Sequence, residues 1–229
     1  MRIFLGDNMA EIPLLTLQEY ENNLSTFELK FPRRFGAENK KLPPMRVVFE
    51  QSLENLEGRP PSPSYFADAV WKQCENLQAD LEDDVKARAR RAHPTFCREI
   101  HLLLLLREAF SESADIHYGV ELDMKNKTDF LITSPVEPIA IRLHTHTNTR
   151  RGNYYAKKQR KTSNKNMSLD ILKDAAGIPV NEEGSIEIDY RITLNKDNCK
   201  NLPNGFWLYS QNHIDEVIEL YEKLHDTLA

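Results

Sequence analysis

The spacing of apolar residues predicts helices in the middle and at the end of the chain. From residue 65 to about 91, apolar side chains recur every three or four positions, which is the spacing of an amphipathic helix. The dipeptide His93-Pro94 predicts a break, since proline disfavours helix in the residue before it. A second, strongly apolar helix is predicted from Pro94 to Phe110, and a final amphipathic helix over 214–228.

Beyond Ser111 the period changes to an alternation of apolar and polar residues, which is typical of strands. Three short strands joined by tight turns, a meander, are predicted at 116–122, 129–133 and 139–145. A helix over 148–161 and a long alternating strand over 185–194 complete the order. The pattern therefore predicts an α/β domain with a helix, a three-strand meander, a helix and a strand.

The first 64 residues carry weaker signals. A short helix is predicted over 14–24, and 45–50 favours a strand. The proline-rich stretch 58–64 is typical of a linker. We therefore predict an N-terminal segment of unknown role (1–64) followed by one α/β domain (65–229).

Composition limits the class of protein. The chain has 229 residues, 40% of them hydrophobic, enough for one large domain or a core domain with a smaller attachment. The longest apolar run, Leu102 to Leu106, is far too short to cross a bilayer. Three widely separated cysteines (Cys74, Cys97 and Cys199) fit a reducing compartment. These features predict a soluble, cytoplasmic protein that does not engage a membrane.

The positive charge is concentrated in one segment. The net charge is −5, yet residues 138–169 contain no Asp or Glu. The rest of the chain holds 22 basic against 35 acidic residues, because this segment carries eight of the 30 lysines and arginines. These eight are Arg142, Arg150, Arg151, Lys157, Lys158, Arg160, Lys161 and Lys165. Such a segment favours binding of a phosphate-bearing partner.

The order of elements, together with Lys127-Thr-Asp129-Phe-Leu-Ile132, resembles the core of the PD-(D/E)XK nuclease superfamily, the fold of many restriction endonucleases. The resemblance covers roughly 94–194. It implies a restriction-endonuclease-like core in which Asp129, at the opening of the second strand, holds Mg²⁺. It also implies Glu99 as an acid on the first helix, with Glu121 on the neighbouring strand as a second metal-binding carboxylate.

The third strand departs from the family pattern of Glu, any residue, Lys. Arg142 occupies the Glu position and His144 the Lys position. Two interpretations follow. In the favoured one, hydrolysis is lost and Arg142 contacts phosphate through its planar guanidinium. In the other, a divergent Mg²⁺ site uses Asp129, Glu121 and Glu99, with His144 as ligand or general base.

The basic segment provides candidate nucleic-acid contacts. Its cations steer a polyanion and its tyrosines stack on exposed bases. The predicted contact residues are Arg142, Arg150, Arg151, Tyr154, Tyr155, Lys157, Lys158, Arg160 and Lys161. The alternative is a solvated helix face paired with acids elsewhere, such as Glu82-Asp83-Asp84. Similarly, Glu99 is open to a structural explanation as one half of an ion pair at the edge of the core.

Three functional hypotheses remain open from the sequence. The first is a nucleic-acid-binding protein, with DNA favoured, in which the nuclease-like fold has lost catalysis. The second is an active Mg²⁺-dependent endonuclease, and the third a binder of nucleotides or small phosphoesters. The resemblance further implies a context in restriction, phage defence or mobile-element machinery, with a homodimer or a larger defence complex as the assembly.

Overall fold

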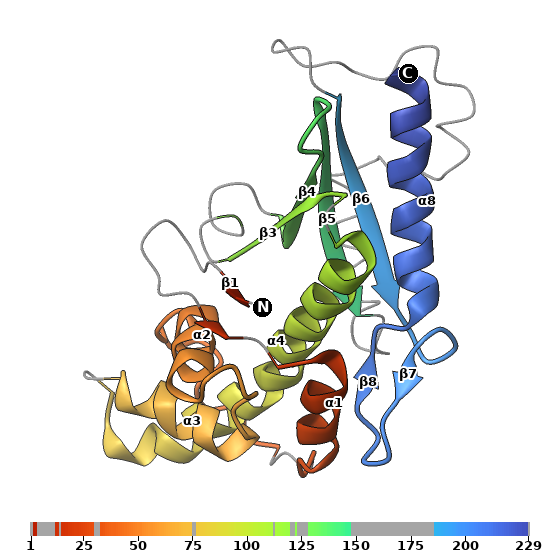
Figure 1. The fold of residues 1–229 in the computed structure, drawn as a ribbon. Helices are drawn as coiled ribbons and strands as arrows, with labels where there is room; N and C mark the ends of the chain where they lie inside the picture. The colour runs from red at the N-terminus through yellow and green to blue at the C-terminus, as the bar shows by residue number, and fades with distance from the viewer. Residues whose placement is uncertain are drawn as a thin grey trace. The chain divides into compact units, whose positions relative to one another are not determined.

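The computed structural model describes residues 15–29, 33–74, 77–111, 113–119, 122, 128–147 and 186–228, and the backbone of two short strands near the N-terminus. The chain folds into two compact units. The first comprises Met1–Leu104 and Asn201–Leu208, and the second Leu105–Lys200 and Tyr209–Ala229. The sequence boundary at residue 64 falls inside the first unit, within the first turn of the helix Pro63–Lys72 (Figure 1).

Helices make up most of the first unit. Strands β1 (Arg2–Ile3) and β2 (Ile12–Pro13) pair antiparallel. They are followed by α1 (Leu17–Ser25), α2 (Met45–Asn55), α3 (Pro63–Lys72), a 3-10 turn (Ala79–Leu81) and α4 (Glu82–Phe110), which enters the second unit at Leu105. A hairpin of β7 (Lys200–Asn201) and β8 (Trp207–Leu208) returns to this unit.

Local capping explains where two of these helices begin. The Thr16 hydroxyl accepts a hydrogen bond from the Glu19 amide, and the Glu19 carboxylate accepts from the Thr16 amide, which is a complete capping box at the start of α1. Ser62 caps α3 through the Tyr65 amide, with Pro63 in the first turn. The predicted helix over 14–24 is thereby confirmed as α1.

The predicted break at His93-Pro94 is wrong, because Pro94 lies inside α4. The neighbouring His93 explains why the helix continues. Its side chain is fully buried and packs against the rings of Phe27, Phe49 and Phe66. Its Nε2 donates a hydrogen bond of 2.7 Å to the carbonyl of Pro61. This packing holds the segment in one helix despite the proline, which costs a helix interior about 3 kcal/mol.

Two further helix predictions need correction. The single helix predicted over 65–91 is divided between α3 and α4, and Gln78, which precedes the 3-10 turn, has an extended backbone. The strand favoured at 45–50 is the helix α2 instead. Val48, Phe49 and Leu53 form one buried face at helical spacing there, and this burial outweighs the strand preference of the β-branched residues.

The second unit contains a four-stranded mixed sheet. Its strands are β3 (Asp115–Tyr118), β4 (Phe130–Thr133), β5 (Ile139–Thr147) and β6 (Ile186–Leu194), in that order across the sheet. The first three are antiparallel neighbours, and β6 runs parallel to β5. The predicted meander and the fourth strand are therefore confirmed, and the chain is of the α/β class (Figure 1). The first strand is shorter than predicted, since β3 ends at Tyr118 and not at residue 122.

Alternation along the strands separates an apolar face from a polar face. Phe130, Ile141 and Ile188 are buried, and the ring of Phe130 stacks on Tyr118 at 5.1 Å. The helix α8 (Gln211–Leu228) packs beside β5 and confirms the predicted final helix. Its buried hydrophobic residues are Ile214, Val217, Leu220, Tyr221 and Leu224. The other face carries mostly polar side chains, with the apolar Leu131 and Ala140 among them.

Across the part of the chain that the structure describes, no helix combines the length and the apolar character that a bilayer crossing requires.

Candidate nucleic-acid interface

Asp129 lies directly before β4, at the position that the sequence predicted for the opening of the second strand. Its amide donates to the carbonyl of Leu143 across the sheet, at 3.1 Å. Its Oδ2 accepts two hydrogen bonds from Thr145, from the amide at 2.5 Å and from the hydroxyl at 2.8 Å. Since Phe130 pairs with Leu143, Asp129 stands one position further along, opposite His144. The carboxylate is thus held at the end of the β4–β5 pair.

The polar face of β5 is paired with β6. Arg142 forms an ion pair with Glu187, with 2.5 Å between guanidinium nitrogen and carboxylate oxygen. His144 Nε2 donates to the Asp189 carboxylate at 3.0 Å. In both pairs the β6 residue lies two positions before the register partner, because Arg142 pairs with Asp189 in the backbone ladder. The side chains therefore lean along the strands, and each of the two basic residues of β5 contacts one acidic residue of β6.

The next position along this face has a different electrostatic character. By the same two-residue offset, His146 corresponds to Arg191 on β6. Burial lowers the pKa of His146, and the positive charge of Arg191 lowers it further. The imidazole of His146 is therefore neutral at neutral pH. The two acidic residues of β6 thus pair with Arg142 and His144, and the next residue of β6 on this face is the positively charged Arg191.

Glu99 does not lie on this sheet. It belongs to the first unit, where its carboxylate binds the guanidinium of Arg46 from α2. Both side chains are more than nine-tenths buried. The structural explanation offered by the sequence, an ion pair at the core, is confirmed, with Arg46 as the partner. The adjacent Arg98 donates instead to the carbonyl of Trp207.

Most of the predicted contact residues lie outside the described part of the chain. The predicted metal ligand Glu121 and the helix predicted over 148–161 also lie outside it. The basic-segment residues concerned are Arg150, Arg151, Tyr154, Tyr155, Lys157, Lys158, Arg160 and Lys161. Of the predicted site, the structure describes Asp129, Arg142 and His144 on the sheet, and Glu99 apart from it.

Within the ranges that the structure describes, no three His, Cys, Asp or Glu side chains converge so that they could hold a metal ion. Asp129 is engaged with Thr145, and Asp189 with His144. A Mg²⁺ site at Asp129 would therefore depend on residues beyond the described ranges.

The acids proposed as alternative partners of the basic segment have other partners. Glu82 binds Lys86 one helical turn away, and Asp83 binds Arg34. Both contacts lie within the first unit. These two carboxylates are thus already balanced by nearby cations, which reduces their capacity to neutralise residues 138–169.

Sequence reasoning missed Glu187 and Asp189. Both stand at polar positions of the alternating strand 185–194, so their exposure on one face was readable from the pattern. Their pairing with Arg142 and His144 requires the parallel register of β5 and β6, which lie 45 residues apart at His144 and Asp189. No local signal specifies that register.

Comparison with protein-family models, with curated proteins and with solved structures finds no match to this chain. The site must therefore be interpreted from its own geometry and charge.

Proposed function

We propose that this chain is a nucleic-acid-binding protein with a nuclease-like core that does not cleave its ligand. The observation that carries the proposal is the third strand, β5. It begins the acid-free segment 138–169, and it presents Arg142 and His144 where the nuclease pattern has a metal-binding Glu and a Lys. A guanidinium repels Mg²⁺ but attracts phosphate, so the substitution favours binding over hydrolysis.

The arrangement of strands supports the same proposal. The helix α4, the antiparallel β3–β4–β5 meander and the parallel β6 follow the order of the core that the sequence resembles. Asp129 opens the second of these strands, where the resemblance expects an Asp.

The ion pair between Arg142 and Glu187 is compatible with phosphate binding. Both side chains are about one-third exposed, at 36% and 32%. Pairs with this exposure contribute roughly 0–1 kcal/mol to stability. A phosphate that meets the guanidinium in a bidentate manner can therefore replace Glu187 at small cost.

The test compares nucleic-acid binding by the wild-type chain with binding by a variant in which positive charges of the basic segment are replaced by negative ones. We expect the wild-type chain to bind a fluorescently labelled DNA duplex or single strand with a steep dependence on salt. Replacing Lys157, Lys158 and Arg160 together by Glu should abolish the anisotropy change. The matched control replaces Lys40, Lys41 and Lys72, three exposed lysines of the first unit, by Glu. Equal loss in both variants would show a general charge effect and would refute the proposed interface.

The second candidate is an active Mg²⁺-dependent endonuclease. It is favoured by the position of Asp129 opposite His144 at the end of the β4–β5 pair. Incubation of plasmid and single-stranded substrates with Mg²⁺ or Mn²⁺ tests it, and Asp129→Ala should remove any cleavage. Absence of cleavage by a preparation that binds DNA supports the binding protein. Cleavage that persists in Asp129→Ala excludes this site.

A further inference from the structure

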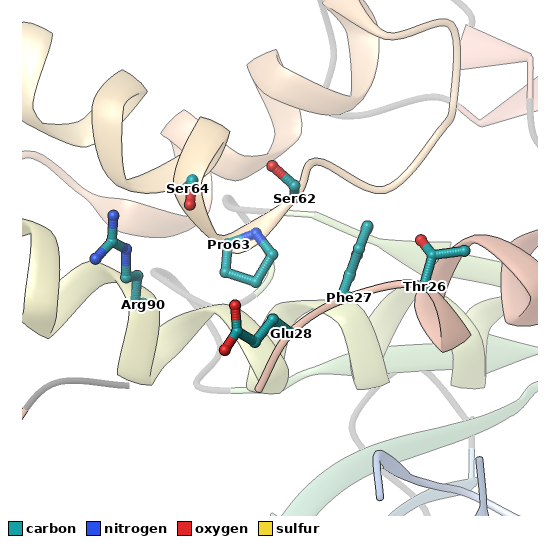
Figure 2. A pocket seen from close by; sticks show the side chains of 7 residues that line it. All are labelled: Thr26, Phe27, Glu28, Ser62, Pro63, Ser64 and Arg90. Atoms are coloured by element: carbon teal, nitrogen blue, oxygen red, sulfur yellow. The ribbon is translucent and has the colours of Figure 1, made fainter. Parts of the chain in front are cut away.

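The first unit contains a pocket that the proposed function does not use. It has a volume of about 400 Å³ and lies among the segment after α1, the start of α3 and the middle of α4. Figure 2 shows Arg90 of α4, Ser64 of α3 and Glu28 around the ring of Pro63, with Phe27 further along the same wall. The pocket is therefore lined by a cation, an anion, hydroxyls and two apolar rings.

Arg90 is the least satisfied arginine of this helix. Its Nε is buried and has no hydrogen-bond partner among the described residues. The neighbouring arginines differ, since Arg88 donates to the carbonyls of Ala37 and Lys40, and Arg91 to the carbonyl of Arg34. A buried donor without a partner costs about 1–3 kcal/mol, so such groups are rare unless a ligand or water completes them. Arg90 also lines the pocket, so a ligand bound there is a candidate acceptor for this side chain.

Glu28 supplies the opposite charge. Within the described residues its carboxylate forms no ion pair, and it does not pair with Arg90, although both line the same pocket. Ser64 adds a hydroxyl and a backbone amide in the first turn of α3, where amides lack an acceptor within the helix. A donor group thus lines one part of the pocket and an acceptor group another.

We propose that this pocket binds a small zwitterion of the amino-acid class. A simple anion would be attracted by Arg90 but repelled by Glu28, and a simple cation would meet the reverse. A ligand with a carboxylate for Arg90 and Ser64 and an ammonium group for Glu28 satisfies both charges. The rings of Phe27 and Pro63 provide an apolar wall for its side chain. This inference is independent of nucleic-acid binding.

The experiment is calorimetric titration of the full chain with L-phenylalanine and L-leucine as probes. N-acetyl-L-phenylalanine retains the carboxylate alone, and L-phenylalanine amide retains the ammonium alone. N-acetyl-L-phenylalanine also resembles the C-terminal residue of a peptide, and L-phenylalanine amide resembles the N-terminal residue. We expect at least one free amino acid to bind with a dissociation constant of about 1 mM or tighter. Each singly charged derivative should bind at least about tenfold more weakly, since it leaves one pocket charge unmatched.

Variants test the residues. Arg90→Gln and Glu28→Gln should each weaken binding of the amino acid about tenfold. The controls Lys72→Gln and Glu54→Gln, at exposed positions of the same unit, should bind as the wild type does. Comparison of the derivatives on the wild-type chain remains decisive if a variant does not fold. Absence of binding by both amino acids, or equal binding of a singly charged derivative, would overturn the proposal.

Discussion

His144 on β5 donates a hydrogen bond to Asp189 on β6, which lies two positions before Arg191, the backbone partner of His144. Arg142 reaches Glu187 with the same offset. The two acids of β6 therefore act as internal counter-charges for the basic residues of β5. Any phosphate that approaches Arg142 competes with Glu187 for the same guanidinium. The strength of this competition can be measured.

We predict that Glu187→Gln strengthens binding of DNA. The change frees Arg142 and removes a negative charge from the polar face, so affinity should rise roughly three- to tenfold, which corresponds to about 1 kcal/mol. The dependence on salt should also become steeper, because one more cation is available to replace counterions. Fluorescence anisotropy at several salt concentrations measures both effects.

The control is Asp226→Asn, which makes the same change of charge at an exposed position of α8. It should have a smaller effect on affinity. If Glu187→Gln and Asp226→Asn alter binding equally, Arg142 does not contact the nucleic acid.

A second prediction concerns the hydrogen bonds between Asp129 and Thr145. Asp129→Asn should lower the free energy of unfolding by about 1–3 kcal/mol, since a neutral amide oxygen accepts the two hydrogen bonds from Thr145 more weakly than a charged carboxylate oxygen does. Thr145→Val removes the hydroxyl alone and should cost less. Urea denaturation measures both variants. Unchanged stability in Asp129→Asn would mean that the carboxylate does not anchor the β4–β5 end.

The sequence was most informative where burial is one-sided and local. The alternation of β4 and β5 and the spacing of α8 each follow from one apolar face, and the structure contains all three elements. The interpretation was wrong where distant residues decide the conformation. Pro94 continues a helix because His93 is buried among aromatic rings from α2 and α3, which no local window contains.

The residues of the candidate site also divide into those predictable from the local sequence and those that depend on distant partners. The position of Asp129 before the second strand was readable from its own segment, whereas its place opposite His144 is given by the register of β4 and β5 in the structure. The partners of Arg142 and His144 come from β6, which is brought alongside by a parallel crossover rather than by a turn. The partner of Glu99 is likewise remote, since Arg46 lies 53 residues earlier.

A third prediction separates structural from catalytic roles for Glu99. Because the Arg46–Glu99 pair is buried, Glu99→Gln should lower stability by about 3–5 kcal/mol, leaving the guanidinium without its counter-charge. The double variant Arg46→Met with Glu99→Leu should recover much of this loss, since both charges are removed together. Thermal or urea unfolding measures the stability of the wild type, of Glu99→Gln and of the double variant. If the double variant is no more stable than Glu99→Gln, the two residues are not coupled.

A fourth prediction follows from the environments of the three cysteines. Complete burial raises the pKa of the Cys97 thiol well above its usual range. Partial burial also raises the pKa of the Cys74 thiol, but the side chains of Cys74 and Cys199 are partly exposed and open to a reagent. Since the thiolate is the reactive form, iodoacetamide at mildly alkaline pH should label Cys74 and Cys199 in the folded chain and leave Cys97 unmodified. Peptide mass spectrometry identifies the sites, with labelling in denaturant as the control. Rapid labelling of Cys97 in the folded chain would contradict its burial.

The last prediction concerns stability at low pH. Burial lowers the pKa of His93 to about 4, although its hydrogen bond to Pro61 acts in the opposite direction. Between pH 6.5 and 4 the unfolded chain therefore binds a proton at this residue more readily than the folded chain does. Stability must fall as the pH falls through this window, by about 3 kcal/mol from His93.

The measurement compares urea unfolding of the wild type and of His93→Gln at several values between pH 7 and pH 4. Glutamine does not titrate there, and its side-chain amide retains a donor for the Pro61 carbonyl. All other ionisable groups are common to the two proteins, so the difference between the two curves isolates His93. The wild type should lose its advantage over His93→Gln as the pH falls, because protonation forces an uncompensated charge among Phe27, Phe49 and Phe66. Parallel curves would mean that His93 titrates alike in the folded and unfolded chain.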